Sequence, residues 1–433
     1  MIFHRSTTVA GALLLLAALP AAAAPEPSRV HALVGARVVV APGRTLSEAT
    51  IVVRDGLIAA VGARLAPPPD ARIWDLEGKT VYAGLIDLWA PTAWPLDKPG
   101  EAPAAAAPNA VVRPERDVLD RPRDEKAWKA YRSAGFSTVL LVPADGVLRG
   151  RGALVDLGDD VASGVLRADA VTAAELRPVK EWEDYPESHM GVIALLRQSF
   201  LDARWYRQAQ AAYRANPAQS RPRYDASLAA LEPAAHGEMP IVFECDNVAE
   251  ELRAAALAEE FGLRAWIVGG GDEYRRLDEL RSHSYPLVLP LAFPERPQVG
   301  EGDDLSVGLD DLRHWDAAPA NPARLTAGKI PFALTAFRQK EPAAFWKALA
   351  SAIERGLPAD RALAALTQVP AEFAGLSGRL GTIEAGKVAN FVVTDGDLLV
   401  AEPKIETVWV DGQPFAHEDD RATPAKPAKE RDR

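Results

Sequence analysis

Short apolar runs alternate with amphipathic segments through most of the chain. The apolar runs have the length of buried strands and cover residues 81–88, 137–142, 240–243, 265–268, 287–291 and 331–335. Periodic apolar positions predict helices over residues 124–133, 188–215, 248–261, 272–281, 342–355 and 359–366. This alternation favours a parallel α/β architecture. A (β/α)8 barrel fits the span of residues 84–380, and a doubly wound sheet is the alternative.

Both ends of this α/β region carry short strand patterns. The patterns cover residues 31–40, 50–61, 71–76, 390–394 and 405–410. Asp55-Gly56 and Asp411-Gly412 are dipeptides typical of tight hairpin turns. We therefore expect strands from both terminal segments to pair in one small β domain, into which the α/β region is inserted.

The first 24 residues have the pattern of a secretory signal peptide. A basic start ends at Arg5, an apolar run covers residues 9–20, and four alanines precede Pro25. The apolar run is shorter than the roughly 20 residues that span a bilayer. We expect a periplasmic or secreted protein with no membrane segment after signal cleavage.

Composition narrows the class of protein further. Hydrophobic residues make up 48% and charged residues 25% of the 433 positions, which is typical of soluble globular proteins. The net charge of −11 argues against nucleic acid or an anionic membrane surface as the partner. The single cysteine, Cys245, excludes an internal disulfide, and we expect it to be a small buried apolar residue.

Residues 95–122 and 294–304 have the composition of loops, and residues 417–433 that of a disordered tail.

Three stretches of the chain resemble the amidohydrolase superfamily, close to its imidazolonepropionase-like branch. The first contains residues 51–61 and then DLEGKTVYAGLID at residues 75–87. The second is ALTQVPAEFAGL at residues 365–376, and the third is GRLGTIEAGKVANFVV at residues 378–393. The three stretches keep the order and separation that they have in the family.

The resemblance implies a (β/α)8 TIM-like barrel with a small β-sandwich formed from both terminal segments. On this basis we expect the sandwich in residues 28–83 and 378–416, and the barrel in residues 84–377. Active members of the superfamily bind zinc or another divalent metal at the carboxyl end of the barrel. The metal activates a water molecule, which attacks an amide, an ester or a related centre.

The positions of the metal ligands carry other residues here. The resemblance implies a His-x-His pair at the end of the first barrel strand, where this sequence has Trp89 and Pro91. Glu244 stands for the histidine of strand five, Gly269-Gly270-Gly271 for that of strand six, and Phe337 for the aspartate of strand eight. Zinc sites in proteins take His, Cys, Asp or Glu. We therefore expect no resident metal or other cofactor.

The other potential ligands do not make a familiar metal site. After His4, the histidines are His31, His189, His236, His283, His314 and His417, and no two of them stand at His-x-His or i, i+4 spacing. An oxygen-rich site from Glu244, Cys245, Asp246 and Asp272 would suit calcium or magnesium. The alternative is that Glu244 pairs with an arginine and that Asp246 caps the helix beginning near Val248.

A glycine-rich segment at residues 143–152 carries Arg149 and Arg151. Backbone N–H and guanidinium groups in such a loop can bind a carboxylate or a phosphate. A purely structural loop is the alternative. Together with Glu244, Asp246 and Asp272, these two arginines are the candidate ligand-binding residues.

Two further segments resemble large exported amidohydrolase-like proteins with two halves, one of which lacks the metal ligands. They are YPESHMGVIALLRQSFLDAR at residues 185–204 and DLRHWDAAPANP at residues 311–322. This resemblance implies a paired, separately encoded, metal-competent homologue. The first expectation is thus a catalytically inactive partner subunit, or pseudoenzyme. The alternatives are an active periplasmic hydrolase of C–N bonds with an atypical metal site, and a periplasmic module that binds a small molecule through Trp89 and the Arg149 segment.

Overall fold

The computed structural model describes residues 29–91, 111–159, 164–178, 185–297 and 307–416. The expected signal peptide, the tail with His417 and much of the two expected loops lie outside the described residues. Within the described ranges, no helix is both long enough and apolar enough to cross a membrane.

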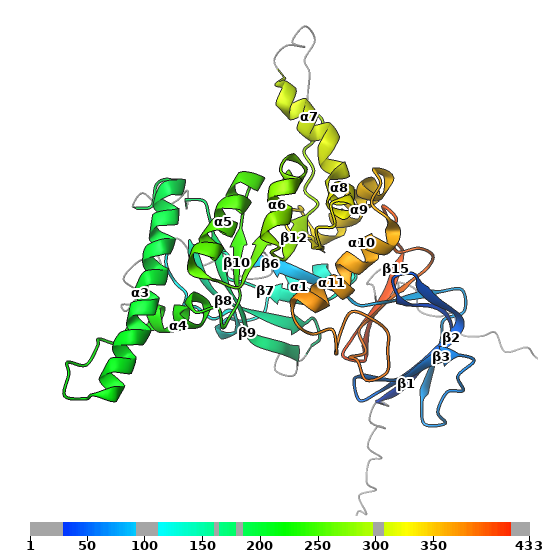
Figure 1. The fold of residues 1–433 in the computed structure, drawn as a ribbon. Helices are drawn as coiled ribbons and strands as arrows, with labels where there is room; N and C mark the ends of the chain where they lie inside the picture. The colour runs from blue at the N-terminus through cyan, green and yellow to red at the C-terminus, as the bar shows by residue number, and fades with distance from the viewer. Residues whose placement is uncertain (1–28, 92–110, 160–163, 179–184, 298–306, 417–433) are drawn as a thin grey trace, which may run out of the picture.

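Eight strands form a barrel that is nearly closed (Figure 1). In sheet order from one edge they are β13 (Phe332–Thr335), β12 (Leu287–Pro290), β11 (Ala265–Val268), β10 (Ile241–Glu244), β9 (Val165–Glu175), β8 (Leu148–Asp156), β7 (Phe136–Leu141) and β6 (Leu85–Ala90). The two edge strands, β13 and β6, lie against each other. The barrel is therefore confirmed, and the doubly wound alternative is wrong.

The barrel departs from strict (β/α)8 topology at one strand. β8 runs antiparallel to both of its neighbours, β7 and β9, whereas the other neighbouring pairs are parallel. Only six residues separate Leu141 from Leu148, and a parallel crossover needs about a dozen or more. The short connection therefore forces the chain to return as a hairpin.

Helices lie on the outside of the barrel, which most of them cover and from which one projects (Figure 1). They are α1 (Glu125–Ser133), α3 (His189–Ala215), α4 (Ala226–Ala235), α5 (Val248–Phe261), α6 (Leu277–His283), α7 (Leu309–Ala317), α8 (Asn321–Ala327), α9 (Phe345–Glu354), α10 (Ala359–Leu366) and α11 (Gln368–Phe373), with 3-10 turns at η2 (Val118–Asp120), η3 (Glu273–Arg275), η4 (Ala318–Ala320) and η5 (Pro342–Ala344).

Side-chain caps explain where several helices begin. Asp124 accepts a hydrogen bond from the backbone N–H of Ala127, and Ser188 accepts one from Gly191. The predicted helix over residues 272–281 is instead split into η3 and α6, because the backbone of Arg276 leaves the helical region.

A second sheet joins the two terminal segments. Its strands are β1 (Val30–Ala41), β2 (Arg44–Arg54), β3 (Leu57–Ala63), β4 (Arg72–Asp75), β5 (Thr80–Ala83), β14 (Phe391–Thr394), β15 (Ile405–Val410) and β16 (Gln413–Ala416). The order is β16-β15-β14-β5-β1-β2-β3, and β4 pairs with β1. The antiparallel pair β5–β14 connects the two segments, with Tyr82 opposite Val392. Pairing of the terminal segments is confirmed, and their division into two packed layers stays a prediction.

Candidate functional site at the barrel mouth

The carboxyl ends of the parallel barrel strands bring four functional side chains together. Trp89 lies near the end of β6, and Glu175 and Glu244 are the last residues of β9 and β10. Arg149 is the second residue of β8, and the reversed direction of this strand brings it to the same edge. Barrels of this kind carry their active sites at this edge.

Arg149 is the centre of a buried ion cluster. Its Nη1 donates a hydrogen bond of 2.8 Å to Oε2 of Glu244, and its Nη2 forms an ion pair with Glu175. The indole Nε1 of Trp89 donates to the same Oε2 of Glu244 at 3.0 Å. The guanidinium carbon lies 5.8 Å from the centre of the Trp89 ring. All four side chains are buried.

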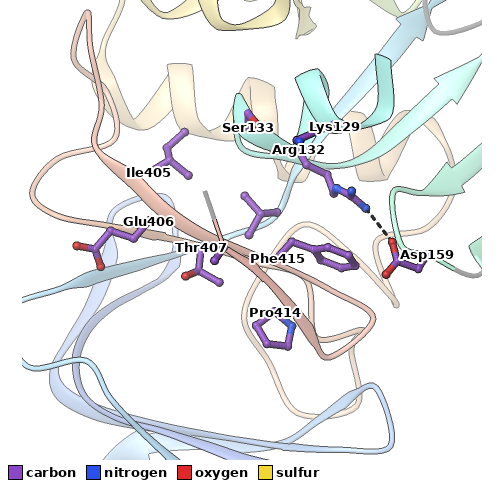
Figure 2. A pocket seen from close by; sticks show the side chains of 11 residues that line it. Lys129, Arg132, Ser133, Asp159, Ile405, Glu406, Thr407, Pro414 and Phe415 are labelled. Carbon is purple, nitrogen blue, oxygen red and sulfur yellow. Dashed lines mark hydrogen bonds and ion pairs between the residues drawn. The ribbon is translucent and has the colours of Figure 1, made fainter. Parts of the chain in front are cut away.

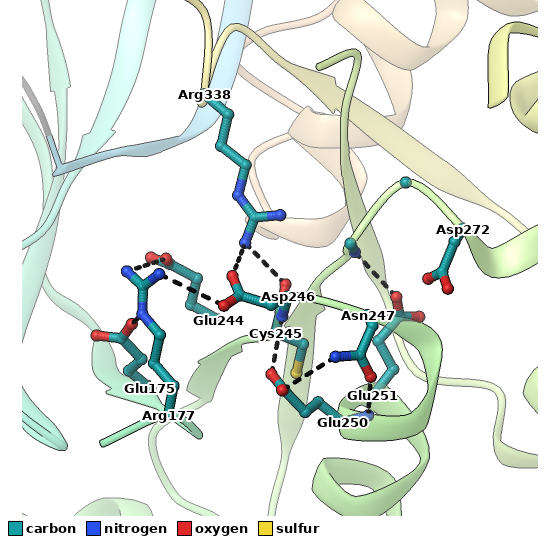
Figure 3. Close-up of polar contacts among 12 residues, drawn as sticks. Glu175, Arg177, Glu244, Cys245, Asp246, Asn247, Glu250, Glu251, Asp272 and Arg338 are labelled. Carbon is teal, nitrogen blue, oxygen red and sulfur yellow. Dashed lines mark hydrogen bonds and ion pairs between the residues drawn. The ribbon is translucent and has the colours of Figure 1, made fainter. Parts of the chain in front are cut away.

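Further charged side chains lie next to Glu175 and Glu244 (Figure 3). Arg338 donates to Oδ1 of Asp246 at 2.7 Å and to the carbonyl oxygen of Cys245 at 2.9 Å. Arg177 pairs with Glu175, lies 3.4 Å from Oδ2 of Asp246, and approaches Oε1 of Glu244 to 3.9 Å. With Arg149, Glu175 and Glu244, the network holds three cations and three carboxylates, so its formal charges cancel.

The two buried carboxyl groups respond differently to this environment. Burial works to raise the pKa of Glu244, but the charge and hydrogen bonds of Arg149 outweigh it, and the pKa lies below its ordinary value. For Glu175 burial is the larger influence, and its pKa is raised despite Arg149. The cluster therefore contains at least one carboxylate that is ionised at neutral pH and held by a fixed cation.

Asp87 fixes Trp89 and ties the two edges of the barrel together. Its Oδ1 accepts a hydrogen bond of 2.9 Å from the backbone N–H of Trp89, and its Oδ2 accepts one of 2.9 Å from Ala336, which follows β13. The hydroxyl of Thr335 donates to the carbonyl oxygen of Trp89 at 3.2 Å. Burial raises the pKa of Asp87 to about 6.

The side chains at this mouth do not fit a divalent metal. Indole and pyrrolidine groups offer no lone pair where the His-x-His pair would stand, and the oxygen atoms of Glu244 face Arg149 and Trp89. Among the residues that the structure describes, no three His, Cys, Asp or Glu side chains converge as a metal site requires. A guanidinium, rather than an open coordination position, neutralises the carboxylates here.

The remaining sequence candidates have other partners. Asn247, not Asp246, caps α5, so the cap expected from the sequence is wrong by one residue. Asp272 accepts a hydrogen bond of 2.7 Å from the backbone N–H of Val248. Phe337 follows β13 and lies under the guanidinium of Arg338. Asp246 and Asp272 thus do not join Glu244 in one oxygen-rich site.

The Arg149 segment is not the open loop that the sequence suggested. Residues 148–152 belong to β8, because their backbone pairs with β9. Arg151 pairs with Asp117 at 2.9 Å and with Asp169 at 2.5 Å. Both arginines are therefore engaged by carboxylates of the chain itself.

Sequence reasoning missed the contributions of Glu175, Arg177 and Arg338. The i, i+2 spacing of Glu175 and Arg177 at the end of an apolar run was the available signal. Cys245, in contrast, is a buried free thiol as expected, and burial raises its pKa.

A second pair of acidic side chains is buried beside the mouth. Glu251 of α5 accepts a hydrogen bond of 3.0 Å from Gly270, and Glu273 accepts one of 3.0 Å from Gly271. A Cβ atom at Gly269 would lie 2.0 Å from Oε1 of Glu273, so any other residue there would have to displace that carboxyl group. Asn321 donates to the other oxygen of Glu273. Burial raises the pKa of Glu251 well above its ordinary value, and the neighbouring Glu273 raises it further.

A separate cavity of about 340 Å³ lies between α1 and the β15–β16 hairpin (Figure 2). Arg132 lines it, stacks on Phe415 at 4.2 Å, and donates to the carbonyl oxygen of Leu157 at 2.8 Å. None of the residues of the Arg149 cluster lines this cavity.

Comparison with known proteins agrees with the fold. Residues 344–416 match the amidohydrolase family. A segment of 72 residues is 43% identical to the amidohydrolase tasK of Hapsidospora irregularis, and it spans 17% of this chain but only 7% of that protein.

Solved structures resemble a much larger part of the chain. An amidohydrolase from Thermotoga maritima MSB8 superposes with a TM-score of 0.75 and 22% identity, over 89% of this chain and 100% of that one. A Xaa-Pro dipeptidase with bound methionine gives a TM-score of 0.55 and 16% identity, over 90% and 100% of the two chains. At these identities the likeness concerns the fold alone.

Proposed function

We propose that this chain is a pseudoenzyme of the amidohydrolase superfamily, whose fold it resembles and whose family model matches residues 344–416. In isolation it does not hydrolyse substrates by a metal-activated water. The observation that carries this proposal is the buried Arg149 cluster. Its guanidinium neutralises Glu175 and Glu244 at the edge of the barrel where the superfamily holds its metal.

The electrostatics of the cluster support the proposal. A divalent cation entering the mouth would meet the positive charge of Arg149 at close range, and it would have to displace two ion pairs to reach Glu244. Trp89 also fills buried volume beside the same carboxylate. Breaking a buried ion pair costs on the order of 3–5 kcal/mol.

Zinc titration of the purified chain tests this proposal. The chain is saturated with zinc, passed through a desalting column and competed with a chromogenic chelator. We expect less than one tightly held zinc per chain and no turnover of amide or ester substrates. One retained zinc together with turnover would instead support the active hydrolase with an atypical metal site. A thermal shift with a small molecule, without turnover, would support the binding module.

We further propose that the chain acts as a partner subunit of a metal-competent homologue. Support comes from α7, which projects away from the barrel (Figure 1). Leu309, Leu312 and Trp315 on this short helix are exposed. Large apolar side chains gathered on a projecting element are typical of a protein-binding surface.

Affinity purification from the native host tests the pairing. We expect the tagged chain to retain an amidohydrolase whose sequence keeps the His-x-His pair, and we expect Leu312→Glu to weaken that retention. Recovery of the wild-type chain without such a homologue would contradict the pairing.

Export to the periplasm is part of the same proposal, and residues 1–24 support it. N-terminal sequencing of the protein recovered from the periplasmic fraction should begin at or near Pro25. Full-length protein confined to the cytoplasm would contradict it.

A further inference from the structure

Helix α3 carries an exposed stripe opposite the face that packs on the barrel. Its buried residues, which include Val192, Leu196, Phe200 and Ala203, point inward. Figure 1 shows α3 at the outer edge of the molecule, and α4 packs against it. The opposite face carries Met190, Leu201 and Trp205, which are 81%, 53% and 60% exposed.

The exposed stripe is symmetric in its spacing. It comprises Met190, Ala194, Arg197, Leu201, Trp205, Gln208 and Ala212, all of which are exposed. The intervals are four, three and four residues on each side of Leu201. With 3.6 residues per turn, these positions stay on one face of the helix over about 33 Å.

This symmetry lets the stripe match a second copy of itself. If two α3 helices pack antiparallel with their Leu201 side chains on a two-fold axis, Met190 lies opposite Ala212, and Ala194 lies opposite Gln208. Met190 and Gln208 then each meet an alanine of the other copy, which allows the two helices to approach closely. An isologous contact of this kind is the commonest arrangement in protein dimers.

The charges of the stripe also suit self-association. Arg197 is its only ionised residue, and it is paired with Glu260 of α5 at 2.8 Å, so two copies do not repel each other strongly. In the antiparallel arrangement Arg197 faces Trp205 of the other copy. A guanidinium over an indole face is a favourable cation–π contact.

We propose that α3 is a homodimer interface, with Leu201 on the two-fold axis. A single pair of helices buries less surface than an obligate dimer, so the association is weak and depends on concentration. This interface is separate from the α7 surface, and it does not depend on whether the chain lacks hydrolase activity.

Sedimentation velocity of the purified mature chain tests the interface, from about 1 µM to about 100 µM. We expect a shift from monomer toward dimer with increasing concentration. Leu201→Glu places two carboxylates against each other on the axis and should raise the dissociation constant at least about tenfold. Val400→Glu is the matched control, because Val400 is also an exposed apolar residue but lies outside α3, and its dissociation constant should equal that of the wild type.

Oxidation of a cysteine variant tests the two-fold axis itself. Two Leu201→Cys chains present their thiols to each other, and diamide, which is reduced in the reaction, should join them in a disulfide-linked dimer. The native Cys245 is buried and does not compete. Val400→Cys should stay monomeric on a non-reducing gel.

Several outcomes would overturn the proposal. A chain that remains monomeric at every concentration, and whose Leu201→Cys variant does not crosslink, has no such interface, and the stripe then faces a different protein. A dimer that Leu201→Glu leaves intact uses another surface. Circular dichroism of each variant confirms that the fold is retained, so that loss of the dimer is not mistaken for unfolding.

Discussion

The indole Nε1 of Trp89 donates a 3.0 Å hydrogen bond to Oε2 of Glu244, a residue 155 positions later in the chain. The two side chains come from the first and fifth strands of the barrel, where the superfamily resemblance implies histidine ligands. Arg149 donates to the same oxygen atom. The two positions where metal ligands are expected are therefore joined by a hydrogen bond from the indole of Trp89. The guanidinium of Arg149 takes the place of the metal beside Glu244.

Removal of Arg149 should destabilise the protein strongly. Arg149→Met keeps much of the side-chain volume but leaves Glu175 and Glu244 buried without their central cation. We expect the free energy of unfolding, measured by urea denaturation, to fall by about 3–5 kcal/mol. The fall should be larger at pH 8 than at pH 5, because protonation relieves the unpaired carboxylates at low pH.

An exposed arginine supplies the control for that variant. Arg54 pairs with Asp70 at 2.9 Å, and both side chains are about half exposed. Arg54→Ala should change the free energy of unfolding by less than about 1 kcal/mol. Equal effects of the two substitutions would mean that the Arg149 cluster does not stabilise the barrel.

Asp87 should make stability depend on pH. Its pKa is about 6 in the folded protein, against an ordinary value of 3.8 for a solvated aspartate. The folded state therefore binds the proton more tightly, so the contribution of Asp87 is full below about pH 4 and is lost as the pH rises through 6. The loss is on the order of 3 kcal/mol.

Asp87→Asn isolates this contribution. The amide group cannot accept from both Trp89 and Ala336, so the variant should be less stable than the wild type, with the largest difference near pH 4. Urea denaturation of both proteins between pH 4 and pH 7 measures the difference. If the gap between the two proteins stays constant across that range, Asp87 does not titrate near pH 6.

The Glu251–Glu273 pair should respond to pH in the same direction. The pKa values of Glu251 and Glu273 are both raised in the folded protein. The contribution of the pair to the free energy of unfolding is therefore present at low pH and is lost as the pH rises above the ordinary value of 4.5. Glu251→Gln removes one ionisable group while keeping an oxygen atom for Gly270. We expect the variant to gain on the order of 1 kcal/mol relative to the wild type at pH 8 and little at pH 5. Melting temperatures at the two pH values check this, and an equal loss at both would refute it.

Restoring the histidine pair alone should not restore a metal site. In the double variant Trp89→His/Pro91→His, Arg149 still forms its ion pair with Glu244. Chelator competition should therefore detect no tightly bound zinc. Adding Arg149→Met frees the carboxylate, and only the triple variant should retain zinc. Tight binding by the double variant would show that the guanidinium is no obstacle.

Helices with local signals were predictable from the sequence. The apolar period of residues 188–215 and the cap at Ser188 gave α3 to within one residue, and residues 248–261 and 359–366 agree with α5 and α10. In these segments the residues that determine where the helix begins and ends lie in the helix or directly beside it.

Strands β8 and β9 were not predicted, for a physical reason. The glycines at positions 150 and 152 have the sequence signature of a loop, yet the carbonyl oxygen of Arg116 lies 2.7 Å from where a Cβ of Gly150 would be. Close approach of another backbone, rather than a turn, requires glycine there. That approach depends on tertiary structure.

The role of Arg149 was out of reach for the same kind of reason. Its two carboxylate partners are 26 and 95 residues away. Sequence alone indicated that Glu244 meets either a metal or an arginine, but not which arginine. Only the antiparallel run of β8 brings that guanidinium to the mouth.

The pairing of β5 with β14 has a consequence for how the molecule is made. Residues 80–83 pair with β1 on one side, but they find their second neighbour only when residues 391–394 become available. The terminal sheet therefore cannot close until those residues have been synthesised. Such distant pairings slow folding, because a long stretch of chain must be ordered before they form. The half-made sheet would meanwhile present unpaired strand edges, which are the surfaces that chaperones protect from aggregation.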